Sequence, residues 1–219
     1  FCRTTECGFL ELGQPTLSKG MTACRQDGIN NIIVLPAFLL PGEHTQRDIP
    51  NIIGTLSQSH PEIKIHFAST LGTKPEILKV CKERIKEAES FSPKSIPRSK
   101  SLFICIAHGS HDTNLNSEVE DNFNLLGKKL GFAKTVIHFA GTSSQSLEDV
   151  LDKFMTGEFD RVTLLPFFLF TGVWVKRVHA LADTFQKKHQ NTEFLKVSCL
   201  KHHELIVDAL IHQAQEHLP

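Results

Sequence analysis

Short apolar runs alternate with amphipathic stretches along almost the whole chain. Runs rich in β-branched and aromatic residues lie at 6–12, 31–39, 63–69, 101–107, 134–140, 161–169 and 193–199. Patterns typical of helices lie between them, for example over about 15–28, 44–58 and 75–89. Near-continuous apolar strands that alternate with helices are typical of parallel βαβ units whose sheets are covered on both faces. The pattern therefore predicts an α/β fold with parallel sheets flanked by helices.

A change of composition divides this pattern into two parts. The segment ESFSPKSIPRSK, residues 89–100, is rich in serine, proline and lysine, which is typical of a linker. We therefore predict an N-terminal half over 1–90, a linker over 91–100 and a C-terminal half over 101–219. Each half is long enough for a hydrophobic core of its own.

The two halves repeat one another. Residues 32–49, IIVLPAFLLPGEHTQRDI, align without a gap with residues 162–179, VTLLPFFLFTGVWVKRVH, at an offset of 130 positions. The identical pairs are Leu35/Leu165, Pro36/Pro166, Phe38/Phe168, Leu39/Leu169, Gly42/Gly172 and Arg47/Arg177. The same offset places 64–69 on 194–199. Similarity at a fixed offset over most of both halves indicates an internal duplication, so we expect both halves to share one fold.

The repeat is asymmetric at positions that could carry chemistry. His44 of the N-terminal half is aligned with Trp174 of the C-terminal half, and Glu11 is aligned with Gly141. The counterpart of the predicted strand at 101–107 falls before residue 1, so the N-terminal half lacks one βα unit of the repeat. We expect that about 30 residues have been lost or left out upstream, and a natural deletion of that unit is the alternative. The counterpart of His108 would belong to the absent unit.

Charge and composition exclude several classes of protein. The 24 Lys and Arg residues balance 24 Asp and Glu residues, so the chain has no electrostatic footprint for nucleic acid or an anionic membrane surface. No apolar run reaches the roughly 20 residues that span a bilayer. The six cysteines form no C-x-x-C pair, so we expect reduced thiols and a cytoplasmic location.

A candidate ligand site follows the predicted strand at 101–107. The sequence SLFICIAHGSHD leads from the strand directly into His108, Gly109 and Ser110. In open α/β sheets, ligands bind at the carboxyl ends of the strands, so His108 stands where a ligand is expected. Gly109 permits a close approach of the backbone, and Ser110 can hydrogen-bond an anion. His44 holds a comparable position, because it follows another strand after a Pro-Gly break.

The chain resembles the class II tetrapyrrole chelatases in the segments GFLELGQPTL, IIVLPAFLLPGEHTQRDIP, LGTKPEIL, IAHGSHD and LLPFFLFTGVWVKRV, which together cover nearly its whole length. More narrowly, it resembles the sirohydrochlorin cobaltochelatases and ferrochelatases of CbiX type in their long, two-half form. The resemblance implies two duplicated flavodoxin-like or chelatase-like halves with a cleft between them. It also implies a lyase that inserts a divalent metal into sirohydrochlorin without ATP, in cobalamin or sirohaem biosynthesis.

The resemblance implies that His44 is a metal ligand and proton acceptor, paired with a histidine upstream of the chain. Imidazole suits Co²⁺, Fe²⁺ and Ni²⁺, and with an ordinary pKa of about 6.5 it can take up the pyrrole protons at neutral pH. Glu11 would be a third ligand or proton acceptor, and a solvated glutamate at a strand end is the alternative. His108 would be a further metal ligand, or a remnant that orders the turn.

Sirohydrochlorin is an apolar macrocycle that carries carboxylates, so its site needs apolar walls and positive or N–H donors near the rim. The residues that we expect to contact it are Gly42, Arg47, Ser69, Thr70, Gly109, Ser110, Trp174 and Arg177. Trp174 would offer a flat apolar face to the ring. Core packing explains Trp174 equally well, because Val178 and Phe185 share its helical face.

The metal would be a substrate, Co²⁺, Fe²⁺ or Ni²⁺, among which histidine ligands discriminate little. We expect no organic cofactor, no nucleic-acid or membrane partner, and a monomer or weak homodimer. Two alternatives stay open: a non-catalytic tetrapyrrole- or metal-binding protein derived from the chelatase fold, and a generic two-lobed small-molecule binding protein. The spacing of five further histidines fits no metal site, so we interpret them as surface residues: His111, His202, His203, His212 and His217.

Overall fold

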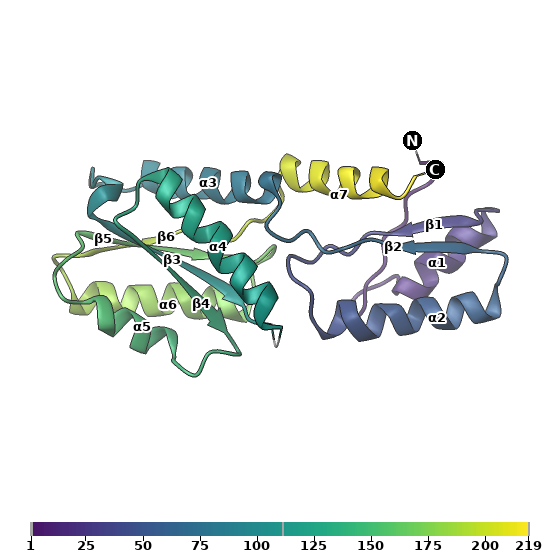
Figure 1. Cartoon of the computed structure of the whole chain (residues 1–219), viewed down its shortest axis with the longest axis horizontal. Coiled ribbons are helices and arrows are strands. Elements are labelled where there is room, and N and C mark those ends of the chain that lie inside the picture. Colours follow the sequence, from purple (N-terminus) through teal and green to yellow (C-terminus); the bar gives the residue numbers. More distant parts are fainter. Residues whose placement is uncertain (1, 111, 219) are drawn as a thin grey trace. The chain divides into compact units, whose positions relative to one another are not determined.

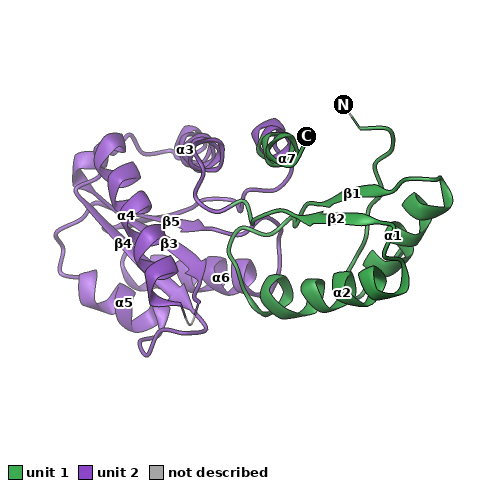
Figure 2. Cartoon of the chain, turned by 45° about the vertical axis from the view of Figure 1, so that its right-hand side comes forward, with its two compact units in different colours: residues 1–71, 209–219 green, residues 72–208 purple. Residues whose placement is uncertain are grey.

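The computed structural model describes residues 2–110 and 112–218 and divides into two compact units. Unit 1 comprises residues 1–71 and 209–219, and unit 2 comprises residues 72–208 (Figure 2). Each unit contains parallel strands with helices packed against them, which confirms the predicted α/β class.

Unit 2 contains a parallel sheet of four strands in the order β4-β3-β5-β6. The strands are β3 (Ser101–His108), β4 (Lys134–Ala140), β5 (Arg161–Pro166) and β6 (Glu193–Lys196). The central strands β3 and β5 are buried almost throughout, which explains their near-continuous apolar sequences. Because the strands are parallel, their carboxyl ends share one edge of the sheet, and β3 ends there at His108.

Helices cover both faces of this sheet. They are α3 (Pro75–Ser90), α4 (Thr113–Leu130), α5 (Leu147–Phe154) and α6 (Val173–Lys188). Figure 1 shows α3 and α4 on one face and α5 and α6 on the other. A short 3₁₀ helix, η2 (Arg98–Lys100), leads into β3.

Unit 1 has two parallel strands, β1 (Asn31–Val34) and β2 (Lys64–Phe67). Its helical elements are α1 (Leu17–Gln26), the π-helical turn η1 (His44–Asp48), α2 (Ile49–Ser59) and, from Ala209 on, α7 (Glu204–Glu216).

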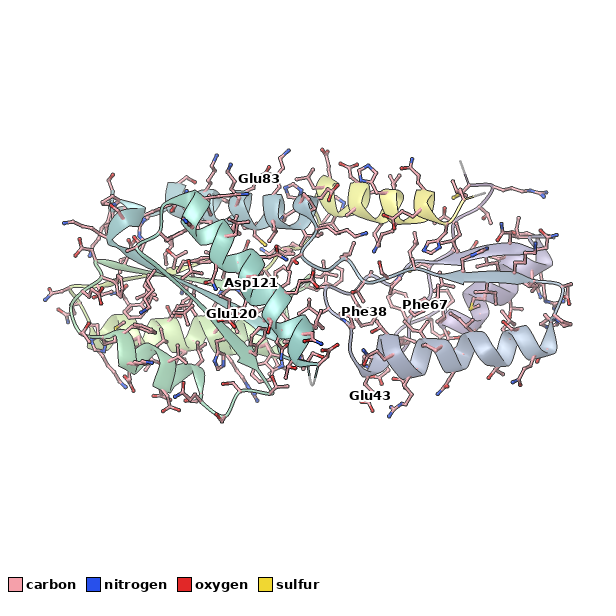
Figure 3. All side chains as sticks on the ribbon, viewed as in Figure 1. Phe38, Glu43, Phe67, Glu83, Glu120 and Asp121 are labelled. Carbon is pink, nitrogen blue, oxygen red and sulfur yellow. The ribbon has the colours of Figure 1, made fainter. Side chains whose placement is uncertain are left out.

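The core of unit 1 lies between its strands and the helices α1 and α2. Its most buried side chains include Met21, Ile32, Val34 and Ile49. Figure 3 shows Phe67 on this side of the strands. Side chains alternate along a strand, so His66 points to the other face, where the His217 ring centroid lies 6.1 Å from that of His66. The end of α7 thus packs on the second face.

Residues 6–12 do not form the predicted strand. Residues 6–8 have no regular structure, and Phe9 forms only an isolated bridge with Thr16. The equivalent strand in unit 2, β4, pairs with β3 alone. Within the part of the chain that the structure describes, no strand stands beside 6–12 as β3 stands beside β4. The backbone groups of this segment therefore have no ladder to join.

The pairing register shows that the repeat slips by one residue. Asn31 pairs with Lys64 in unit 1, and Arg161 pairs with Glu193 in unit 2. The offset between equivalent residues is therefore 130 at β1 and β5 but 129 at β2 and β6. The predicted match of 64–69 with 194–199 is wrong by one position, because the sequence alignment allowed no gap.

The additional residue of unit 1 lies in the helical segment after β1. This segment runs from Glu43 to Ser59, and its counterpart in unit 2 runs from Val173 to Lys188. The counterpart is α-helical throughout, whereas unit 1 has a π turn closed by a hydrogen bond from the Ile49 N–H to the His44 carbonyl. A π turn contains one more residue than an α turn, so it accommodates the insertion.

The compact units do not coincide with the repeated halves. α3 and α7 are counterparts in the repeat, because each begins after the last strand of its half. α3 packs on β5 and β6 of unit 2, whereas α7 belongs to unit 1 from Ala209 on. The N-terminal half therefore contributes α3 to unit 2, and the C-terminal half contributes the part of α7 from Ala209 on to unit 1. The boundaries 1–90, 91–100 and 101–219 describe the sequence repeat and stay a prediction.

A buried ion pair holds residues 91–100 within unit 2. Arg161 Nε donates to Glu193 Oε2 at 2.6 Å, and both side chains are almost fully buried. The Ser92 hydroxyl donates to Glu193, and Arg161 donates to the Lys94 carbonyl at 2.8 Å. These bonds matter because a buried charge without partners is strongly destabilising. The predicted linker segment is thereby attached to the starts of β5 and β6.

In the described part of the chain, no helix has both the length and the apolar character that crossing a membrane requires. All six cysteines are free thiols. Burial raises the pKa of the Cys81 and Cys105 thiols, so these two are poor nucleophiles.

We expect Phe103→Ala to lower the free energy of unfolding of unit 2 by about 3–5 kcal/mol. The Phe103 ring is fully buried and stacks on Phe132, with ring centroids 5.0 Å apart. Denaturant unfolding followed by the fluorescence of Trp174, the single tryptophan, measures the change. Phe91→Ala is the matched control, because Phe91 is 82% exposed and its loss should change stability by less than about 0.5 kcal/mol. Equal effects of the two substitutions would contradict this packing.

Candidate functional site

The candidate site of unit 1 lies where the chain after β1 enters its helical segment. The Gly42 carbonyl accepts from the N–H groups of Thr45 and Gln46, at 3.0 and 2.9 Å. The buried Thr45 hydroxyl accepts from the Gly42 N–H at 2.9 Å. These bonds fix the first helical turn and with it the backbone of His44. A Cβ at Gly42 would meet no described atom within 4 Å, so the space beside this backbone is open.

His44 is the first residue of the π turn, and its side chain is 44% exposed. Its Nδ1 lies 2.8 Å from Oδ2 of Asp48. An ionised carboxylate can only accept, so Nδ1 carries the hydrogen of this bond. In the neutral ring Nε2 then keeps its lone pair, which is the form in which imidazole binds a metal ion or takes up a proton. The ring of Phe38, labelled in Figure 3, lies beside it, with centroids 6.1 Å apart.

Asp48 is held through both carboxylate oxygens. His44 occupies Oδ2, and Arg47 Nε donates to Oδ1 at 3.0 Å. The hydrogen bonds from His44 and then Arg47 hold the pKa of Asp48 below its usual value, so the carboxyl is ionised at neutral pH. Arg47 also pairs with Glu43, which Figure 3 shows at the start of the helical segment, away from the strands. The predicted substrate contact Arg47 is thus exposed but shared between two carboxylates.

Asp48 is a site residue that we did not predict from the sequence. One signal was present, because Asp48 stands four positions after His44, a spacing at which helical side chains meet. The alignment without a gap set Asp48 opposite Val178, a core residue, and this concealed it.

Glu11 lies in an exposed loop that contains a cis peptide bond between Gln14 and Pro15. An open depression of about 400 Å³ is lined by Leu10, Glu11, Leu12, Gly13, Gln14 and Thr16. Among the described residues, no group hydrogen-bonds or ion-pairs with the Glu11 carboxylate. The Glu11 side chain is exposed and lines this depression.

Ser69 and Thr70 follow β2, at the same edge of the strands as the segment after β1. Both are bound by Gln213 of α7, which is fully buried. Its Nε2 donates to the Ser69 and Thr70 carbonyls, each at 2.9 Å, and lies 3.2 Å from the Ser69 hydroxyl. These two predicted substrate contacts therefore also anchor α7 in unit 1.

His108 and Gly109 form the corresponding strand end in unit 2. His108 Nδ1 donates to the Gly109 carbonyl at 3.0 Å, so its neutral ring also keeps the lone pair on Nε2. Packing requires the glycine, because a Cβ at Gly109 would lie 1.7 Å from Thr142 Oγ1 and 3.0 Å from Phe139 Cβ.

Ser110 stabilises the start of α4. Its N–H donates to Asn116 Oδ1 at 3.0 Å, and its carbonyl accepts from Asn116 Nδ2 at 2.8 Å. The Ser110 hydroxyl accepts from the Asp112 N–H at 3.1 Å. A hydrogen bond from its hydroxyl to a substrate stays a prediction.

Trp174 takes the place of His44 in unit 2. It is partly buried against the core of this unit, and the guanidinium carbon of Arg177 lies 5.2 Å from its ring centroid. Core packing, one of the two expected roles of Trp174, is therefore observed. Two residues shortly before Trp174 in the sequence, Phe170 and Val173, are 66% and 63% exposed. We did not predict these exposed apolar side chains after β5.

Over residues 2–110 and 112–218, no three His, Cys, Asp or Glu side chains are arranged to hold a metal ion. His44 and Glu11 belong to unit 1 and His108 to unit 2. Their roles as metal ligands therefore stay predictions.

Of the histidines interpreted as surface residues, His202 and His212 are exposed. His203 and His217 are partly buried. His203 Nε2 lies 2.9 Å from Glu83 Oε2 within unit 2. His111 lies outside the described residues.

Two solved structures share this fold. SirB from Bacillus subtilis with Fe³⁺ has a TM-score of 0.82 and covers 95% of this chain and 80% of its own, at 23% identity. SirB from Bacillus subtilis subspecies spizizenii in complex with cobalt has a TM-score of 0.78 and covers 96% and 79%, at 24% identity. The likeness establishes a two-half α/β architecture of the chelatase type.

The chain belongs to the CbiX family, whose family model matches residues 2–88 and 102–217. A sirohydrochlorin cobaltochelatase of Priestia megaterium is 27% identical over 213 residues, which are 97% of this chain and 69% of that protein. A sirohydrochlorin ferrochelatase of Bacillus subtilis (strain 168) is 24% identical over 211 residues, 96% of this chain and 78% of that protein. The family predicted from the strand-end motifs is confirmed.

We expect Gly109→Ala to destabilise unit 2 by about 1–3 kcal/mol, because the new methyl group overlaps the Thr142 side chain. Thermal and denaturant unfolding measure the effect. Gly172→Ala is the matched control, since a Cβ there meets no described atom within 4 Å and its φ of −174° suits any residue. A Gly109→Ala protein as stable as the Gly172→Ala protein would show that the loop with Thr142 does not pack as described.

Proposed function

We propose that this protein is a sirohydrochlorin chelatase, a lyase that inserts Co²⁺ or Fe²⁺ into sirohydrochlorin without ATP. Its membership of the CbiX family supports this function, and so do relatives named sirohydrochlorin cobaltochelatase and sirohydrochlorin ferrochelatase. The observation that carries the proposal is the state of His44. Its Nδ1 donates to Asp48, which leaves the Nε2 lone pair free at an accessible position.

Metal insertion makes two chemical demands that an imidazole can meet. The metal ion must lose water to a ligand that later releases it, and imidazole binds Co²⁺ and Fe²⁺ less tenaciously than thiolate does. The pyrrole protons must be accepted near neutral pH, which suits an imidazole base. We infer that His44 serves as metal ligand and proton acceptor. Glu11 assists as a carboxylate ligand or second proton acceptor, which its unpaired state among the described residues supports.

We infer that the macrocycle and its carboxylates contact residues at the strand ends of each unit. In unit 1 these are Gly42, Arg47, Ser69 and Thr70, and in unit 2 they are Gly109, Ser110, Trp174 and Arg177. The exposed apolar side chains of Phe170 and Val173, shortly before Trp174 in the sequence, suit contact with the face of a tetrapyrrole. His108 is proposed as a further metal ligand, since its Nε2 is also free of a proton.

Co²⁺ and Fe²⁺ are proposed as the metals because relatives are named for cobalt and iron chelation. Ni²⁺ fits the same imidazole. We further propose that no organic cofactor takes part, that the protein acts as a monomer or weak homodimer, and that it works in the cytoplasm without nucleic-acid or membrane partners.

A non-catalytic tetrapyrrole- or metal-binding protein is the second candidate. One observation favours it: in the described part of the chain, no group of three metal-ligating side chains is assembled. Such a protein would bind Co²⁺ or the tetrapyrrole and leave the rate of insertion unchanged.

Co²⁺ insertion into sirohydrochlorin, followed by absorbance, separates the two candidates. We expect the full-length wild-type protein to exceed the spontaneous rate and His44→Ala to lower kcat/KM by about 100-fold or more, because one side chain serves both as ligand and as base. The His44 side chain is part-exposed, so its removal should leave folding intact.

His60→Gln is the matched control for that assay. His60 lies in the same unit at the end of α2, and its Nδ1 is 3.5 Å from Glu62, so its loss should leave kcat/KM unchanged. A wild-type protein that binds Co²⁺ but does not exceed the spontaneous rate would establish the non-catalytic candidate. A His44→Ala protein as active as the wild type would remove His44 from the mechanism.

A further inference from the structure

The π turn of unit 1 contains one residue that unit 2 lacks, and this residue contacts His44. The offset between equivalent residues is 130 at the start of both helical segments, where the Gly42 and Gly172 carbonyls each accept their first helical N–H. It is 129 at their ends, where His60 N–H donates to Leu56 and His189 N–H donates to Phe185. Keeping Arg47 opposite Arg177 leaves Asp48 as the residue without a counterpart.

The π turn allows this insertion without disturbing the core. An extra residue in a regular α-helix would rotate everything after it by about 100°. Ile49 and Val178 are nevertheless equivalent, at 3% and 2% exposed, so the apolar face of α2 keeps its register. The insertion is confined to one turn, and that turn carries His44 and Asp48 at its two ends.

The carboxylate and the imidazole occur together and are absent together. In unit 1, Nδ1 of His44 and Oδ2 of Asp48 are 2.8 Å apart, and Arg47 holds the other oxygen at 3.0 Å. In unit 2, Trp174 replaces the histidine, the helix is regular, and the additional residue is missing. The extra residue therefore belongs with the histidine rather than with the frame that both units share.

We propose that Asp48 is a positioning residue for His44. Its carboxylate holds the hydrogen on Nδ1 and fixes the plane of the ring, so that the Nε2 lone pair points to one place. A carboxylate behind a ligating histidine acts in this way on metal affinity without touching the metal. The inference rests on the proposed role of His44 as the metal ligand, and Asp48 itself contacts neither metal nor macrocycle.

The test compares Asp48→Ala with the wild-type whole chain in two measurements. NMR of the His44 ring nitrogens, with the ring neutral, should show the Nδ1–H tautomer in the wild type and a mixture of tautomers in the variant. Titration with Co²⁺ alone should show an affinity about 10–100-fold lower in the variant. In the insertion assay, KM for Co²⁺ should rise by a similar factor, with a smaller fall of kcat at saturating metal.

Two further variants separate positioning from a merely structural role. Deletion of Asp48 should convert the segment into a regular helix like α6, with an unchanged thermal unfolding curve and the same loss of Co²⁺ affinity. Asp48→Glu keeps a carboxylate within reach of Nδ1 and should restore part of the affinity. Glu43→Gln is the control, because Glu43 pairs with Arg47 and not with His44, so the tautomer and Co²⁺ affinity should not change.

The inference is overturned if Asp48→Ala keeps the wild-type tautomer and a Co²⁺ affinity within about twofold of the wild type. It is also overturned if wild-type His44 carries its hydrogen on Nε2. An active wild type combined with either result would leave the proposed function standing. A wild type in which Asp48 controls the tautomer and Co²⁺ affinity, but which does not accelerate insertion, would support the inference and refute the proposed function.

Discussion

The apolar face of α2 must stay buried against β1 and β2, and the rest of unit 1 is arranged around that requirement. Burying an isoleucine or leucine side chain contributes about 1.5–3 kcal/mol, and Ile49, Ile52, Ile53 and Leu56 all pack on this core. A rotation of the helix would expose several of these side chains and lose their burial free energy. A distorted turn weakens about one backbone hydrogen bond, which contributes about 0.5–1.5 kcal/mol. The extra residue is therefore taken up in a π turn, and the turn sets Asp48 beside His44.

The two units share the same backbone at their strand ends, but the π turn that sets Asp48 beside His44 is found in unit 1 and not in α6 of unit 2. The Leu71 N–H donates to the Phe38 carbonyl after β2, and the Leu200 N–H donates to the Phe168 carbonyl after β6. The frame at the strand ends is thus shared, in keeping with a duplicated chelatase of the CbiX family. Among the described residues, unit 1 alone combines that frame with an imidazole whose Nε2 is free and whose Nδ1 is held by a carboxylate. In unit 2 the same position carries Trp174, which is partly buried against the core of that unit.

The sequence predicted those features that depend on hydrophobic periodicity. Strand β4 was placed to the residue at 134–140, and the helix after β1 and the position of His44 at its start were also placed correctly. The apolar run 31–39 gave a shorter strand, because β1 pairs with β2 only as far as Val34, whereas its counterpart β5 continues to Pro166 beside β3. Residues 6–12 carry a strand-like pattern, but pairing depends on a neighbour and not on the segment itself. The π turn and the exchange of α3 and α7 leave no mark on the periodicity, so Asp48 and the composition of the compact units were missed.

The position of Co²⁺ bound to the whole chain tests the central claim most directly, and anomalous diffraction at the cobalt edge locates it. We expect a cobalt peak about 2.1 Å from Nε2 of His44, a distance typical of metal–imidazole bonds, with Nδ1 still hydrogen-bonded to Asp48. Cobalt bound only at other histidines, such as His202 or His217, with Nε2 of His44 unoccupied, would contradict the assignment of His44 as the residue that holds the metal.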